Sequence, residues 1–258
     1  MAPNAKDKAA APCITDGLII RTFNGVGEAD RFVTVLTRDK GVIRAAARGA
    51  RRVKYRAGSA TERLCYYRLR LLRGRDTYIV EDAQPIAVFF GLRADIEKTA
   101  LAQYFCELAA ALCPTEEPAE EPLRLLLNAL HLLADGSRPP TLLKAAVEWR
   151  LLSLAGYMPD MSGCAVCGGN AATMLFSAVD GRLYCPQCDR GNLLALPAGA
   201  TAAIRHLLTC PLEKCFAFSL APDTLRVFSA VAETFLKAQL GRSFKTLDFY
   251  HQLGVNNL

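Results

Sequence analysis

The sequence lacks most features of a secreted or membrane-spanning protein. Its first thirteen residues contain no apolar segment of the kind that forms a secretory signal. Charged residues such as Glu107, Arg124 and Arg150 interrupt the longest apolar stretches, so no run is long enough to cross a bilayer. We therefore expect a cytoplasmic protein without a membrane partner, in which residues 1–13 form a disordered N-terminal tail.

Motifs that would indicate catalysis are also missing. The chain has no Gly-x-x-x-x-Gly-Lys-Ser/Thr phosphate loop, and the glycines Gly25 and Gly27 form an isolated pair that is typical of a turn. None of the three histidines, His131, His206 and His251, begins the His-x-Glu motif of a zinc deaminase. No pattern of a nucleophile with its base is present. These absences predict that the protein is not an enzyme and does not depend on ATP.

Cysteine, by contrast, is abundant, with ten residues in a chain that has no secretory signal. Such cysteines are expected to be free thiols or metal ligands rather than disulfides. Four of them form two Cys-x-x-Cys pairs, Cys164 with Cys167 and Cys185 with Cys188, separated by seventeen residues. This spacing is typical of a zinc site. Two redox pairs or buried thiols are the alternative, and the other six cysteines are interpreted as small buried side chains.

The residues between the two cysteine pairs resemble a β-hairpin with its turn at Asp180-Gly181, which would bring the pairs together. Four thiolates fill a tetrahedral coordination sphere and leave no position for water or substrate. We therefore predict one structural Zn²⁺ in a zinc-finger insert at residues 159–192, with no catalytic residues.

Positive charge is concentrated in the first third of the chain. Residues 1–90 hold 17 Lys or Arg against 9 Asp or Glu, whereas the remainder holds 14 against 16. Within residues 38–75 there are thirteen basic side chains and only two acidic ones, Asp39 and Glu62. This asymmetry predicts a polyanionic partner for the N-terminal part.

Hydrophobic residues in the same part alternate with a period of two. The predicted strands are Ile14–Phe23, Asp30–Arg38, Gly41–Arg48, Glu62–Leu72 and Asp76–Asp82, with turn residues between them. Five short strands predict a small β-barrel over residues 14–84, of the OB-fold type or, as the alternative, SH3-like.

Alternation places arginines and tyrosines together on the outer face of this barrel. Guanidinium groups bind phosphates and aromatic rings accept unstacked bases, which favours a single-stranded nucleic acid as ligand. A solvated face without a ligand and an anionic membrane are the alternatives. The predicted DNA-binding residues are Arg44, Arg48, Arg51, Arg52, Lys54, Tyr55, Arg56, Tyr66, Arg68, Arg70, Arg73 and Arg75.

From about residue 92 onwards the period changes to that of helices and predicts an all-α domain over 92–258, interrupted by the zinc-finger insert. The acidic stretch Glu116–Glu121 is interpreted as a linker, and Pro122 as the first residue of the next helix. Asp223 is expected to cap the last helix, which Gly241 would end. The fold class is thus α+β.

Three stretches, taken in order, resemble the RecO family of bacterial DNA repair and recombination proteins. They are residues 27–52, the segment 154–160 that leads into the cysteine pairs, and the C-terminal Arg242-Ser-Phe-Lys-Thr-Leu247. The resemblance covers residues 14–253. It implies an OB-fold, a helical domain with an inserted zinc finger, and a nucleoid-associated protein of the bacterial cytoplasm that responds to DNA damage.

The resemblance also implies an activity and partners. Family members bind single-stranded DNA, anneal complementary strands without ATP, and assist recombinase loading on DNA coated by single-strand-binding protein (SSB). The implied partners are single-stranded DNA, duplex DNA without sequence preference, the SSB C-terminal tail and RecR. A zinc-ribbon regulator that reads duplex sequence and a metal-dependent enzyme are the competing hypotheses. The first would need a basic recognition helix, and the insert offers only Arg182 and Arg190.

Overall fold

The computed structural model describes residues 12–24, 31–47 and 62–255. These residues form two compact units. The first extends to Val88 and includes Pro114–Glu120, and the second comprises Phe89–Cys113 and the chain from Glu121 onwards. No helix among the described residues is long and apolar enough to span a membrane.

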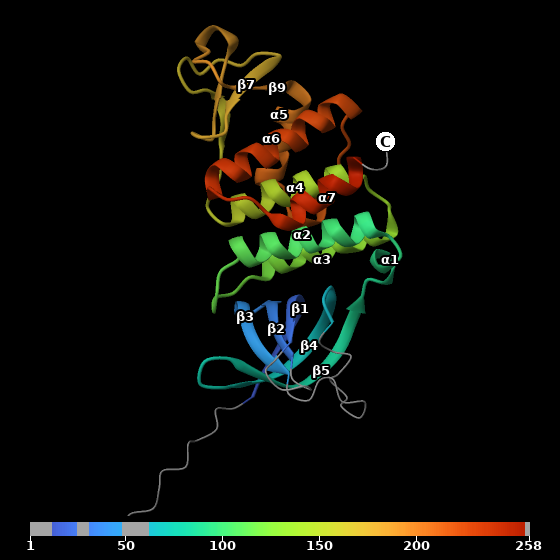
Figure 1. Ribbon diagram of the computed structural model, residues 1–258. Coiled ribbons are helices and arrows are strands. Elements are labelled where there is room, and N and C mark those ends of the chain that lie inside the picture. Colours follow the sequence, from blue (N-terminus) through green and yellow to red (C-terminus); the bar gives the residue numbers. More distant parts are fainter. Residues whose placement is uncertain (1–11, 25–30, 48–61, 256–258) are drawn as a thin grey trace, which may run out of the picture. The chain divides into compact units, whose positions relative to one another are not determined.

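The first unit is a closed five-stranded barrel (Figure 1). Its strands pair in the order β1-β2-β3-β5-β4, with β1 and β4 closing the ring and β3 parallel to β5. This barrel followed by helices confirms the predicted α+β class with an OB-like barrel. The strands are β1 (Cys13–Asn24), β2 (Arg31–Thr37), β3 (Gly41–Ala47), β4 (Cys65–Arg73) and β5 (Tyr78–Val88).

Alternation of side chains along these strands forms the barrel core. Ile43, Ala45 and Ala47 of β3 point inward together with Leu69 and Leu71 of β4. The residues between them, including Arg44, Arg68 and Arg70, therefore point outward, as the period of two predicts. Strand β5 continues six residues beyond the predicted end at Asp82.

The prediction that Glu116–Glu121 forms a linker is wrong. Residues 114–120 belong to the barrel unit, where the Val42 amide donates to Pro114 O at 2.8 Å and the Ala119 amide donates to Arg38 O at 2.9 Å. Thr115 forms a β-bridge with Gly41. Most of its side chains are exposed, and these backbone hydrogen bonds hold the segment against β3 and the turn that precedes it.

The second unit is built from helices (Figure 1). Helix α4 packs against α2, α5 and α6, and α2 also packs against α7. Helix α3 begins at Glu120, two residues before the predicted Pro122, and α7 was not predicted. The helices are α1 (Phe90–Arg93), α2 (Ile96–Leu112), α3 (Glu120–Asp135), α4 (Pro140–Leu154), α5 (Ala198–Thr209), α6 (Pro222–Leu240) and α7 (Lys245–Val255).

The ends of α6 test two capping predictions. Gly241 ends the helix in the left-handed conformation with φ of 59°, as expected. The predicted N-cap, Asp223, is wrong: the helix begins at Pro222 after Ala221, and no side chain caps it. Asp223 instead lies in the first turn of the helix, where it pairs with Arg226. Its negative charge there interacts favourably with the positive end of the helix dipole.

The cysteine-rich insert forms a four-stranded sheet in the order β6-β8-β7-β9. Its strands are β6 (Asp160–Cys164), β7 (Thr173–Ser177), β8 (Arg182–Tyr184) and β9 (Leu194–Pro197). The expected hairpin is β7–β8, with Gly181 at φ of 65° in its turn. Phe176 of β7 packs edge-on against Trp149 of α4, which stacks on Phe235 of α6. The sheet is thereby anchored to the helical core.

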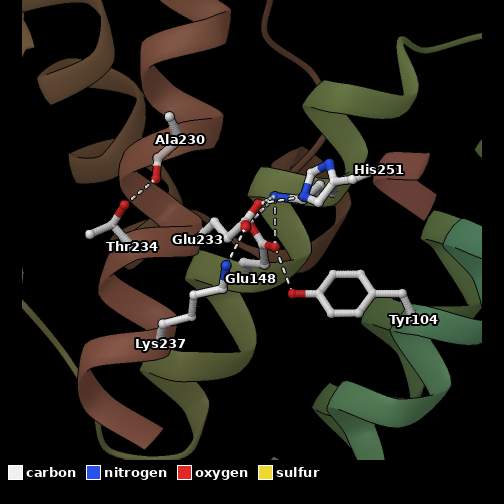
Figure 2. Close-up of polar contacts among 8 residues, drawn as sticks. Tyr104, Glu148, Ala230, Glu233, Thr234, Lys237 and His251 are labelled. Carbon is white, nitrogen blue, oxygen red and sulfur yellow. Dashed lines mark hydrogen bonds and ion pairs between the residues drawn. The ribbon is translucent and has the colours of Figure 1, made fainter. Parts of the chain in front are cut away.

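A cluster of charged and polar side chains lies among four helices of this unit (Figure 2). The ammonium group of Lys144 on α4 lies 2.9 Å from Glu148 and 3.1 Å from Glu233 on α6. Tyr104 on α2 donates its hydroxyl to Glu148 at 2.7 Å, and His251 on α7 lies 2.9 Å from Glu233. The cluster therefore links α2, α4, α6 and α7.

Candidate metal centre and nucleic-acid interface

The four predicted metal ligands converge at one end of the inserted sheet. The sulfur atoms of Cys164, Cys167, Cys185 and Cys188 all lie within 4.8 Å of one another, and all four are free thiols. Cys167 Sγ and Cys185 Sγ are 3.7 Å apart. Zn–S bonds of about 2.3 Å in a tetrahedron place sulfurs about 3.8 Å apart. The four residues can therefore bind a metal ion of this size.

Glycines and backbone hydrogen bonds shape the first cysteine pair. The Gly168 amide donates to Cys164 O at 2.8 Å and the Cys164 amide donates to Gly169 O at 2.9 Å, so the chain turns back on itself. Gly168 has φ of 73°, a conformation that favours glycine. A side chain at Gly163 would place its Cβ only 2.7 Å from Gly168 O. This tight turn directs Cys164 and Cys167 toward the same point.

The electrostatics of the cluster suit a cation. Backbone amides of Cys167 and Cys185 lower the pKa of Cys164 to about 6, which favours its thiolate. The side-chain hydrogen bond with Cys185, and then burial, raise the pKa of Cys188 to about 12, so this thiol resists ionisation where Cys164 favours it. A bound dication removes this conflict, since it stabilises every thiolate at once.

Half of the predicted DNA-binding residues can be located on the barrel. Arg44 lies on β3, Arg73 and Arg75 lie at and beyond the end of β4, and all three are exposed. Tyr66, Arg68 and Arg70 share the outer face of β4, with Tyr66 half-buried. The others lie outside the described residues: Arg48, Arg51, Arg52, Lys54, Tyr55 and Arg56.

Two of the β4 arginines have carboxylate partners on neighbouring strands. Arg68 donates to both carboxylate oxygens of Asp16 on β1, at 2.9 and 3.1 Å. Arg70 donates to Glu81 on β5 at 2.9 Å. Both guanidinium groups are more than half exposed. The Arg70–Glu81 pair is exposed on both sides and contributes about 1 kcal/mol or less, so a phosphate can exchange with Glu81, whereas Asp16 is buried and holds Arg68 with two hydrogen bonds.

Arg73 is held by the segment 114–120. Its guanidinium group donates to Tyr78 Oη at 2.7 Å and to Glu116 at 3.2 Å, and Tyr78 donates to Glu116 at 2.8 Å. Sequence reasoning missed these acidic partners, because each lies on a different element from its arginine. Among the described residues, neither Arg44 nor Arg75 has an ion-pair partner.

An OB-like barrel with outward-facing arginines, in a chain that also contains a helical unit with four clustered cysteines, defines a class of protein suited to binding nucleic acids. Comparison with known sequences specifies the family. The profile described as "Recombination protein O N terminal" matches residues 12–89, and "Recombination protein O C terminal" matches residues 93–248. The chain therefore belongs to the RecO family, whose members act in DNA repair and recombination.

Individual relatives agree with this assignment over nearly their whole lengths. "DNA repair protein RecO" of Acetivibrio thermocellus is 32% identical, covering 93% of this chain and 96% of the relative. The protein of the same name from Symbiobacterium thermophilum is 34% identical, with coverages of 92% and 96%. That from Syntrophotalea carbinolica is also 34% identical, with coverages of 93% and 95%.

Proposed function

We propose that this protein is a recombination mediator that binds single-stranded DNA, anneals complementary strands and assists recombinase loading on SSB-coated DNA, without ATP and without catalysing a reaction. The observation that carries the proposal is the OB-like barrel with exposed arginines on β3 and β4. Charged side chains on a small barrel bind the phosphate backbone without reading sequence, as annealing of arbitrary strands requires.

We propose that the two units have different functions. Residues 14–84 form the DNA-binding domain, which also binds duplex DNA without sequence preference, and residues 1–12 are dispensable. Residues 92–258, interrupted by the insert 159–192, form the helical domain, which carries one structural zinc ion on four cysteines. We propose the SSB C-terminal tail and RecR as protein partners, in the bacterial cytoplasm at the nucleoid. Family membership supports these partners.

The proposed zinc ion would be held by Cys164, Cys167, Cys185 and Cys188. When bound, it would join β6 to the segment after β8 and so stabilise the sheet that packs on Trp149. A complete set of four thiolates leaves no open coordination position, which supports a structural ion rather than a catalytic one.

Annealing of complementary oligonucleotides coated with SSB, without ATP and across a salt series, tests the function. We expect acceleration that falls steeply with salt, with a slope that reflects about five or more phosphates. The double substitution Arg51→Ala with Arg52→Ala should weaken binding and leave thermal unfolding unchanged. The matched control, Arg226→Ala with Lys245→Ala, removes the same charge from exposed positions of the helical unit.

Two results would contradict the proposal. If the folded protein did not bind single-stranded DNA, the proposed function would be wrong. Strong preference for one duplex sequence would favour a regulator that reads duplex DNA.

A further inference from the structure

Two exposed phenylalanines lie opposite each other on the outer face of the barrel. Phe23 on β1 pairs in register with Phe32 on β2, and Phe32 pairs with Ala46 on β3. Phe23 is 53% exposed and Phe32 is 40% exposed. Side chains directly opposite in antiparallel strands have Cβ atoms about 5 Å apart. The two phenylalanines therefore project from the same outer face of neighbouring strands, beside the small side chain of Ala46.

The adjacent cross-strand row carries two arginines. Arg21 on β1 pairs with Thr34 on β2, and Thr34 pairs with Arg44 on β3. Both arginines are exposed. Two strands separate them by about 10 Å across the sheet, and this row lies about 7 Å along the strands from the phenylalanine row. A row with two phenylalanines thus lies next to a row with two arginines on the outer face of β1, β2 and β3.

These arginines differ from those of β4 in their surroundings. Arg68 and Arg70 each donate to a carboxylate of a neighbouring strand. Among the described residues, no carboxylate lies within ion-pair distance of Arg21 or Arg44. As far as the described part of the chain goes, their charge is therefore available to an anion without displacement of an internal partner.

We propose that Phe23, Phe32, Arg21 and Arg44 form a stacking platform for unpaired bases, on which this protein distinguishes single-stranded from duplex DNA. The proposal deepens the proposed function and rests on it. In a single strand the faces of the bases are accessible and stack on exposed aromatic rings, while arginines bind the flanking phosphates. In a duplex these faces are enclosed by neighbouring base pairs, and only the phosphates can be bound.

Substitution of the rings separates stacking from charge. Phe23→Ala with Phe32→Ala should lower affinity for oligo(dT) about tenfold or more, because base–aromatic stacking is lost. The salt slope should stay unchanged, and affinity for a duplex of equal length should change less than about twofold. Arg21→Ala with Arg44→Ala should reduce the slope for single strands by about 1.4, since each phosphate contributes about 0.7. Phe249→Ala, at a phenylalanine of α7 that is 45% exposed, is the matched control.

A fluorescence measurement keeps the test valid if the alanine variant fails to fold. Trp149 is the only tryptophan and is fully buried. In Phe32→Trp, oligo(dT) should quench the added fluorescence by stacking, whereas Phe249→Trp should show no such quenching.

The outcomes distinguish this inference from the proposed function. If the wild-type protein binds oligo(dT) but the folded alanine variant binds equally well, the platform is refuted while the function stands. Absence of quenching in Phe32→Trp refutes the platform too. Loss of RecR binding with unchanged DNA affinity would instead make the surface a protein interface. If the wild type binds no single strands, both proposals fail.

Discussion

Lys144 is the side chain on which the polar cluster of the helical unit depends. It is buried on α4 one turn from Glu148, which is inaccessible to solvent, and it also neutralises Glu233. Burial raises the pKa of Glu148, although Lys144 and the Tyr104 hydroxyl oppose this effect. Burial also acts to raise the pKa of Glu233, but Lys144 and further cations lower it to about 2. Lys144 thus stabilises two carboxylates, and it is the only cation of the cluster that pairs with Glu148 among the described residues.

We predict that Lys144→Met destabilises the protein by about 3–5 kcal/mol, because it leaves a buried carboxylate without its cation. Urea unfolding followed by the fluorescence of Trp149 measures the change in the helical unit. Lys237→Met is the control: this lysine also pairs with Glu233, but its side chain is 44% exposed, so we expect a loss of about 1 kcal/mol or less. Equal stability of Lys144→Met and wild type would show that the ion pairs do not stabilise the fold.

For the arginines of β4, the direction of the side chain could be predicted from the sequence, but the ion-pair partner could not. Period-two alternation correctly placed Arg68 and Arg70 on the outer face, because the apolar residues between them must enter the core. It could not reveal Asp16 or Glu81 as partners, since strand register, and not distance along the chain, brings them together. For the same reason the pair Phe23–Phe32 was missed: each residue alone resembles an ordinary strand residue.

The placement of the segment 114–120 against β3 depends on the backbone at Gly41. Gly41, at the start of β3, has φ of 57°. A Cβ there would lie 2.1 Å from Pro114 O, a backbone atom that cannot move independently of its chain. The close approach allows the Val42 amide to bind Pro114 O.

We predict that Gly41→Ala displaces this segment from β3 and destabilises the barrel by more than the 1–2 kcal/mol or so that a left-handed alanine costs. Hydrogen exchange should become faster at the amides of Val42 and Ala119, which donate across this contact. Gly254→Ala serves as the control, because a Cβ there meets no atom within 4 Å. Unchanged exchange at both amides would mean that the segment accommodates the methyl group.

How well a helix or strand could be predicted from the sequence depended on its length and on the periodicity of its apolar residues. Strands β1 to β4 have clear alternation and were predicted with small errors at their ends, and the end of α6 at Gly241 was predicted correctly. Strands β6 and β9 have five and four residues, too few to show a period. The role of residues 114–120 was missed because it rests on backbone hydrogen bonds, for which side-chain composition gives no signal.

For the protein as a whole, the division into two units predicts that the proposed metal binding and the proposed DNA binding are separable. The four cysteines and the core residues that anchor their sheet, Trp149 and Phe235, belong to the helical unit. The exposed arginines and phenylalanines lie on the barrel, which has its own hydrophobic core. A structural ion stabilises the unit that contains its ligands, because its binding free energy adds to the folding free energy of that unit.

We therefore predict that Cys185→Ser releases the metal and lowers the unfolding temperature of the helical unit, while affinity for oligo(dT) changes less than about twofold. Metal content by mass spectrometry, Trp149 fluorescence during heating and oligonucleotide binding at fixed salt measure the three effects. Cys210→Ser is the matched control, since Cys210 is also buried but lies outside the four-cysteine cluster. Unchanged metal content would refute the assigned ligands. A large loss of DNA affinity with the barrel still folded would show that the metal-bearing unit contributes to the DNA interface, so that annealing requires both units.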